Sequence, residues 1–182
     1  MRIERLGIPD IVRMTPRVFA DDRGWFHECY NEAAVNEAVG YPISFVQDNH
    51  SCSAKGVLRG LHYQLPPHAQ GKLIRVLRGA IFDVAVDIRR GSRTFGSWVS
   101  TELNDENWGQ LWIPPGFAHG FLALADGTEV LYKTTDRWEK DCERSIVWND
   151  RTLRVEWPAG STPILSSKDA EAPTFADAQV FD

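Results

Sequence analysis

The stretch Phe82-Asp83-Val84-Ala85-Val86-Asp87-Ile88-Arg89 decides the fold. Large apolar residues occupy every second position, and Asp, Ala or Arg occupies the positions between them. A period of two indicates a β-strand, because successive side chains of a strand point to opposite faces. Turn signals bound the stretch, with Arg78-Gly79 before it and Arg90-Gly91-Ser92 after it. We therefore predict a strand whose polar face carries Asp83 and Asp87 as solvated or structural carboxylates.

Similar short runs recur on both sides of this strand, at the spacing of a β-sandwich or barrel. Further strands are expected at residues 45–51, 57–64, 98–103, 110–113, 117–124, 129–134, 145–148 and 153–157. One short helix is expected from Asn31 to Gly40, because Asn favours the N-cap, the body is rich in alanine, and Gly ends the run. The sequence therefore predicts an all-β protein with little helix.

The composition is that of one ordinary globular domain. The chain has 182 residues, of which 43% are hydrophobic and 25% charged, and a domain typically takes ~150 residues. The formal charge of -5 argues against a nucleic-acid partner or a polybasic membrane anchor. No apolar run reaches the ~18 residues that span a bilayer, and the N-terminus has charges where a signal peptide is apolar. We expect a cytoplasmic protein.

Cysteine and histidine residues give a weak case for a metal site. Cys29, Cys52 and Cys142 lack a CxxC pair, so they suggest neither a disulfide framework nor a zinc cluster. His62 and His119 lie within apolar strand patterns, and residues 114–119 resemble the second motif of cupin barrels, P-x-G-x-x-H. In the corresponding first motif, however, Gln64 replaces an imidazole. Too few ligands remain for a transition metal, and we predict none.

Eight motifs, in order, resemble one enzyme family. They are DDRGWFHE, QDNHS, GVLRGLHYQ, FDVAVDIRRGSRTFG, QLWIPPGFAHGF, VLYKTTD, VWND and LSSKD, which run from about Gly7 to Pro173. Together they resemble the dTDP-4-keto-6-deoxyglucose 3,5-epimerases, metal-free cupin enzymes that need no cofactor. The resemblance implies one cupin-type jelly-roll domain over residues 1–182. The chain from about residue 158 is rich in Pro, Ser and Asp, so we expect a C-terminal tail that wraps the surface or pairs with another subunit. The resemblance also implies a dTDP-linked 4-keto-6-deoxyhexose as substrate, and a homodimer that exchanges an N-terminal strand.

The resemblance further implies four catalytic residues. His62 is the expected general base, and Asp169 is expected to hold its imidazole. Tyr132 is the expected acid on the opposite face of the sugar, and Lys72 is expected beside the C4 carbonyl oxygen. These roles are chemically sound, because imidazole exchanges protons near neutral pH and an ammonium stabilises an enolate oxygen in a water-poor cavity.

The resemblance also implies a set of substrate-binding residues, which are Arg23, Phe26, Glu28, Gln47, Asn49, Arg59, His119 and Trp138. Arg23 and Arg59 suit a pyrophosphate, because a guanidinium offers a planar and permanently charged donor fork. Trp138 stands where many relatives carry Tyr. Arg59 and His62 are three residues apart, so a regular strand would aim them at opposite faces. Gly60 is therefore expected to mark a β-bulge.

The sequence leaves three alternatives open. A relative that inverts only C3 or only C5 would share the same base and acid. A metal-dependent cupin oxygenase or isomerase would require a bound transition metal. A non-catalytic sugar-nucleotide-binding module would bind the ligand without exchanging its protons.

Overall fold

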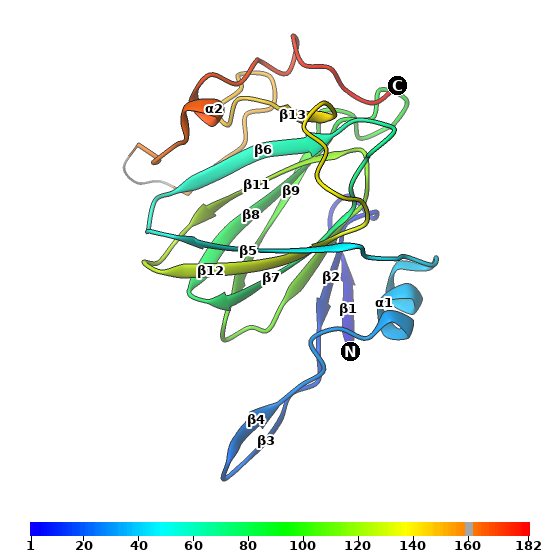
Figure 1. The fold of residues 1–182 in the computed structure, drawn as a ribbon, viewed down its shortest axis with the longest axis vertical. Coiled ribbons are helices and arrows are strands. Elements are labelled where there is room, and N and C mark those ends of the chain that lie inside the picture. The colour runs from blue at the N-terminus through cyan, green and yellow to red at the C-terminus, as the bar shows by residue number, and fades with distance from the viewer. Residues whose placement is uncertain (159–161) are drawn as a thin grey trace.

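Two antiparallel sheets face each other in the computed structural model, which describes residues 1–158 and 162–182. The six-stranded sheet contains, in spatial order, β1 (Arg2–Arg5), β2 (Val12–Thr15), β10 (Gln110–Ile113), β7 (Lys72–Arg78), β12 (Thr128–Thr134) and β5 (Gln47–Ser53). The five-stranded sheet contains β13 (Glu143–Ser145), β6 (Leu58–Gln64), β11 (Phe117–Ala123), β8 (Ala80–Asp87) and β9 (Trp98–Asn104). Figure 1 shows β6, β11 and β8 above β5, β12 and β7. This arrangement confirms the predicted all-β jelly roll.

An apolar core fills part of the space between the sheets. Its buried members include Ile74 and Val130 from one sheet and Ile81 and Phe121 from the other. Tyr132 is only partly buried and packs against this cluster. The phenol of Tyr132 therefore stands where the apolar core gives way to a polar cavity.

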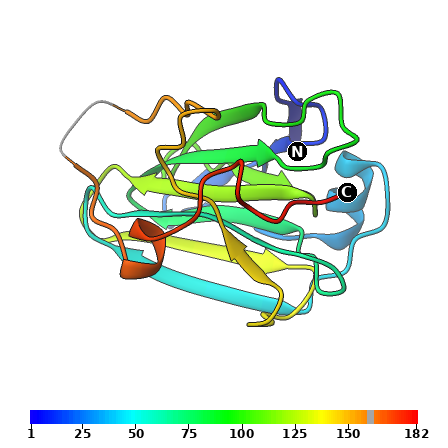
Figure 2. The ribbon, with the colours of Figure 1, turned by 90° about the horizontal axis from the view of Figure 1, so that it is seen from above.

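Two outer layers cover the sheets. The C-terminal segment lies over the outer face of the five-stranded sheet (Figures 1 and 2), where Phe175 and Phe181 pack against Val84 and Val86. Helix α1 (Glu32–Val39) packs with β2 and Trp112 of the six-stranded sheet. The tail thus lies over the barrel, which is one of the two expected arrangements; residues 159–161 of the predicted tail lie outside the described residues.

The predicted helix is confirmed together with its two ends. The Asn31 side chain accepts a hydrogen bond from the backbone of Ala34 at 3.2 Å, and Gly40 is left-handed with φ of 96°. A second helix, α2 (Ser167–Ala170), has only four residues. A helix of this length has no apolar period to reveal it in the sequence.

Most of the expected strands form, with ends shifted by a few residues, but two expectations are wrong. The strand expected at 145–148 is β13, which ends at Ser145. Residues 153–157 form turns and coil, because the Asp150 carboxylate accepts the backbone N–H groups of Thr152 and Leu153. Their apolar side chains pack against the five-stranded sheet from outside. Alternating apolar residues there reflect burial of a coil segment.

Asp83 and Asp87 are not solvated, because both are fully buried. The polar face of β8 points into the space between the sheets, where Ala85 belongs to the apolar core. Asp87 is structural, since it accepts hydrogen bonds from Arg89, Ser92 and Thr94. The two carboxylates thus lie on the inner face of the barrel wall.

A hairpin made of β3 (Phe19–Asp21) and β4 (Gly24–Phe26) projects away from the barrel (Figure 1). All six strand residues are exposed, including Phe19, Trp25 and Phe26. An isolated two-stranded hairpin is marginally stable in water, and clustered exposed aromatic residues mark an interaction surface.

The predicted bulge at Gly60 is present. In the pairing of β6 with β11, His62 lies opposite His119 and Arg59 lies opposite Phe121, so β6 holds one extra residue. Gly60 has φ of 137°, and a Cβ atom there would lie 2.5 Å from the Cα of Gly120. The bulge turns Arg59 and His62 to the same face of the strand.

Candidate active site

A polar cavity lies between the ends of the two sheets. Its walls carry mostly hydrogen-bonding side chains, which are Gln47, Asn49, His62, Tyr63, Gln64, Gln70, Lys72, Tyr132, Trp138 and Glu143. Six of the predicted site residues belong to this set. His62 comes from β6 of one sheet and Tyr132 from β12 of the facing sheet, so an imidazole and a phenol border one cavity from opposite walls.

His62 is held by a carboxylate from the far end of the chain. Its Nε2 atom is hydrogen-bonded to Oδ1 of Asp169, which is 3% exposed. The hydroxyl of Ser166 donates to Oδ2 of Asp169 at 2.9 Å and accepts the backbone N–H of the same residue at 3.2 Å. Ser166 thus caps α2 and fixes the carboxylate.

The Asp169 carboxylate is stabilised in its charged form. Burial raises the pKa of Asp169, but hydrogen bonds from His62 and Ser166, with the nearby charges, outweigh burial and lower this pKa below its ordinary value. An ionised Asp169 fixes the imidazole tautomer, so that the other ring nitrogen of His62 is free to take a proton. The geometry is that of a carboxylate-oriented general base.

Lys72 lies at the buried side of the cavity, with 8% of its surface exposed. Its Nζ atom donates to the backbone carbonyl of His62 at 3.2 Å. Burial lowers the pKa of Lys72 to about 8, while Asp83 and Glu143 act in the opposite direction. An ammonium in such a place stabilises a developing oxyanion more strongly than it would in water.

Tyr132 lies opposite Asn49 in the pairing of β12 with β5. Burial raises the pKa of the Tyr132 phenol, Arg59 lowers it and Glu143 raises it. Because burial dominates, the phenol is protonated at neutral pH. A protonated phenol beside a cavity can serve as a general acid.

Gln47, Asn49 and Trp138 form one linked wall of the cavity. The Gln47 amide donates to Asn49 at 2.8 Å, and its carbonyl oxygen accepts the backbone N–H of Trp138 at 3.1 Å. The Trp138 indole is 55% exposed. Such a ring at the mouth of a cavity offers a stacking face for a nucleobase.

Arg59 and His119 flank this cavity. The bulge aims Arg59 to the same side as His62, and its Nε atom donates to Ser53 of β5 at 3.1 Å. His119 lies opposite His62 in the strand pairing, but it is buried and its Nε2 is bonded to Asp83 at 2.9 Å. His119 therefore stands behind the residues that line the cavity.

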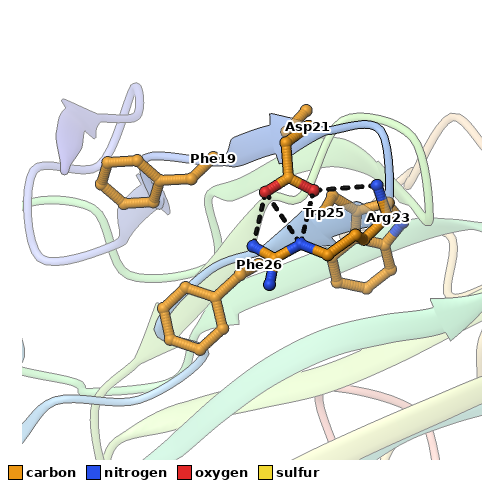
Figure 3. A pocket seen from close by; sticks show the side chains of 7 residues that line it. Phe19, Asp21, Arg23, Trp25 and Phe26 are labelled. Atoms are coloured by element: carbon orange, nitrogen blue, oxygen red, sulfur yellow. Dashed lines mark hydrogen bonds and ion pairs between the residues drawn. The ribbon is translucent and has the colours of Figure 1, made fainter.

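Arg23, Phe26 and Glu28 are not brought to the cavity of their own chain. Arg23 and Phe26 lie on the projecting hairpin, where Arg23 forms an ion pair with Asp21 at 2.6 Å (Figure 3). Glu28 is exposed and accepts a hydrogen bond from Asn31 at 3.5 Å. The physical reason is that the hairpin points away from the barrel (Figure 1), where its Trp25 ring packs edge-on against Trp108 with the ring centroids 4.3 Å apart.

Four lining residues were not predicted from the sequence, namely Tyr63, Gln64, Gln70 and Glu143. Glu143 forms an ion pair with Lys168 at 2.7 Å. Burial raises the pKa of Glu143, but Lys168 and other partners bring it below its ordinary value. A signal existed for Tyr63 and Gln64, which both stand in the GLHYQ motif; Glu143 lies in a three-residue strand with no recognisable pattern.

Among residues 1–158 and 162–182, no group of three His, Cys, Asp or Glu side chains is placed to hold a metal ion. The two histidines of the cupin-like motifs each give Nε2 to a separate carboxylate, Asp169 or Asp83. The three cysteines are free. In the same described part of the chain, no helix has the length and apolar character needed to cross a membrane.

The sequence pattern of the dTDP-4-dehydrorhamnose 3,5-epimerase family matches residues 5–177. The chain belongs to this family. One of its dTDP-4-dehydrorhamnose 3,5-epimerase relatives, from Pseudomonas aeruginosa, is 59% identical over 181 residues, which cover 100% of this chain and 99% of the relative.

Solved structures of epimerases share the fold. The dTDP-6-deoxy-D-glucose-3,5-epimerase RmlC of Legionella pneumophila, in complex with dTDP-4-keto-L-rhamnose, has a TM-score of 0.93 at 46% identity; the match covers 97% of this chain and 93% of that one. The 3'-monoepimerase ChmJ of Streptomyces bikiniensis, in complex with dTDP-quinovose, has a TM-score of 0.88 at 34% identity, covering 94% and 86%. The family thus includes an enzyme described as acting at one carbon.

Proposed function

We propose that this protein is a dTDP-4-keto-6-deoxy-D-glucose 3,5-epimerase that yields dTDP-4-keto-L-rhamnose. The observation that carries the proposal is that His62, bonded to Asp169, and Tyr132 border one cavity from the two facing sheets. Inversion of a carbon needs a proton to leave one face and another to arrive on the other face. A base and an acid on opposite walls meet that requirement.

The reaction follows from these positions. Neutral His62 takes the proton from a carbon next to the C4 ketone, the C–H electron pair becomes the C=C bond of the enolate, and the π pair of the C=O bond moves to the C4 oxygen. Lys72 stabilises that enolate oxygen, and Asp169 stabilises the imidazolium that forms. Tyr132 then gives its proton to the opposite face of the carbon. Exchange with water restores His62 and Tyr132, and the second carbon reacts in the same way.

Binding of the nucleotide part is assigned to the mouth of the cavity. Trp138 stacks on the base, and Gln47 and Asn49 supply hydrogen-bonding amides. Arg59 faces the pyrophosphate, while His119 lies behind the side chains that contact the sugar. No cofactor takes part in these steps. The free cysteines, two of them exposed, suit the reducing cytoplasm as the place of action.

The working enzyme is proposed to be a homodimer. The hairpin exposes Phe19, Trp25 and Phe26 and carries Arg23 away from its own barrel, so we assign Arg23, Phe26 and Glu28 to the cavity of a second copy. Co-expression tests this directly. Chains with Arg23→Ala and chains with His62→Ala should each be inactive alone, while mixed dimers regain one complete site. Failure of the mixture to regain activity would contradict the shared site.

The deciding experiment is turnover in deuterated water followed by proton NMR. The proposed substrate should acquire deuterium at both C3 and C5, with inverted configuration at each. Label at one carbon only would identify a single-carbon epimerase, which is the second candidate because ChmJ is described as a 3'-monoepimerase. Ligand binding without any exchange would indicate a binding module. His62→Ala serves as the control and should lower exchange by ~10² to 10⁴.

A further inference from the structure

The inner face of β8 carries two fully buried carboxylates, Asp83 and Asp87. A buried charge is costly unless it is paired. Asp87 is paired by hydrogen bonds from Arg89, Ser92 and Thr94 at 2.6 to 2.9 Å. Asp83 has a different environment, because its hydrogen-bonding partner is His119.

The contact between Asp83 and His119 is close on both carboxylate oxygens. Nε2 of His119 lies 3.1 Å from Oδ1 and 2.9 Å from Oδ2 of Asp83. Ionised carboxylate oxygens only accept hydrogen bonds, so Nε2 must be the protonated ring nitrogen. The carboxylate thereby fixes the orientation of the His119 ring directly across the strand pair from His62.

Asp83 also balances positive charge at the buried side of the cavity. Burial lowers the pKa of Lys72 to about 8, and Asp83 is the first of the groups that raise it again. The charged and titratable groups that act on Lys72 come from three other elements: Asp83 on β8, Glu143 on β13 and Lys168 on α2. The backbone carbonyl of His62 accepts a hydrogen bond from Lys72. The positive charge of Lys72 in turn lowers the pKa of His119.

We propose that Asp83 is a positioning residue of the epimerase: it orients His119 and supplies the buried negative charge that keeps Lys72 an ammonium. This inference rests on the proposed function. A lysine that must stabilise an enolate oxygen has to be charged before the reaction begins. In a site that excludes water, that charge needs a fixed counter-charge.

The test compares Asp83→Asn with Asp87→Asn, which removes an equally buried carboxylate on the same strand and face. We expect Asp83→Asn to lower kcat at least about tenfold, as loss of a ring-orienting carboxylate does in other enzymes. The alkaline limb of kcat/KM should also move to lower pH, because the group that raises the pKa of Lys72 is lost. Asp87→Asn should lower the melting temperature and leave the alkaline limb in place.

Three outcomes overturn the inference. One is an Asp83→Asn enzyme whose alkaline limb coincides with that of the wild type. Another is an equal displacement of that limb in Asp87→Asn. If Asp83→Asn does not fold, His119→Gln gives the third test, because its amide can still donate to Asp83. In His119→Gln the alkaline limb of kcat/KM should stay in place while kcat falls. A displaced limb would show that the pKa of Lys72 is set by His119 and not by Asp83. A wild-type protein that exchanges no deuterium would instead refute the proposed function.

Discussion

Asp169 holds His62 from a four-residue helix that lies 107 positions further along the chain. The contact joins β6 to the segment that wraps the outside of the barrel. Correct docking of this segment is therefore a condition for an oriented base. The local stability of α2 and the activity of the enzyme should consequently be linked.

Replacing Asp169 with Asn should leave the fold intact and lower kcat by ~10² to 10⁴, because the amide no longer fixes the imidazole tautomer or stabilises the imidazolium. Substrate KM should change little. Steady-state kinetics together with thermal unfolding tests this prediction. A loss of kcat that is matched by loss of folded protein would assign Asp169 to stability alone.

Ser166 should contribute through its hydroxyl as well as through its capping position. Glycine at an N-cap costs only a few tenths of a kcal/mol relative to serine, but it cannot donate to Asp169. Ser166→Gly and Ser166→Ala should therefore both lower kcat several-fold, while Ser166→Thr stays close to the wild type. Exposed Ser167 is the matched control, and Ser167→Ala should have no effect. If Ser166→Gly kept wild-type activity, Ser166 would act only as the N-cap of α2, and its hydrogen bond to Asp169 would not contribute to catalysis.

Gly60 should be irreplaceable because the bulge brings the strands too close for a side chain. The Cβ of Ala at this position would meet the backbone of Gly120 at 2.5 Å, and we expect a loss of ~3 kcal/mol in unfolding free energy. Gly56 also has positive φ, but nothing lies within 4 Å of its Cβ position. Gly56→Ala should cost only ~1 kcal/mol. Urea denaturation would separate the two, and equal losses would contradict the steric account.

Asp87 should make the free energy of unfolding depend on pH in the acid range. Burial raises the pKa of Asp87, but hydrogen bonds from Arg89, Ser92 and Thr94 outweigh it and lower the pKa to about 2. Because this carboxyl has a pKa near 4 in the unfolded chain, the lower pKa in the folded state stabilises the fold at every pH above about 4. The contribution is ~2 kcal/mol at neutral pH. This contribution disappears as the pH falls from about 4 to about 2. The difference in unfolding free energy between the wild type and Asp87→Asn should therefore shrink as the pH falls through that range. A difference that stays constant would contradict the lowered pKa of Asp87.

Most strands of the two sheets and helix α1 could be predicted because their signals are local, whereas β1, β2 and β7 were not predicted. Alternation marked β8, and Asn31 and Gly40 marked the ends of α1. Even the bulge at Gly60 could be predicted, since two inward side chains three residues apart require one. The strand predicted at residues 153–157 is wrong, because a coil packed on a sheet shows the same alternation as a strand.

The candidate site could be predicted only in part. His62 and Tyr132 stand within recognisable motifs on seven-residue strands, whereas Lys72 lies in none of the eight motifs and begins β7, which was not predicted. The contact of Asp169 with His62, by contrast, depends on how a non-repetitive tail crosses the barrel, and no local pattern encodes that path. The burial of Asp83 was likewise missed, because a polar residue in an alternating strand is normally solvated. Only the facing sheet shows that this side of β8 is closed off.

The central claim is that His62 removes the proton and Tyr132 returns one from the opposite side. It is tested most directly by incubating Tyr132→Phe with substrate in deuterated water and following both exchange and configuration by NMR. The account predicts that Tyr132→Phe still exchanges substrate protons but inverts the carbons more slowly than the wild type does. His62→Ala should neither exchange the protons nor invert the carbons. Exchange that persists in His62→Ala but vanishes in Tyr132→Phe would contradict it.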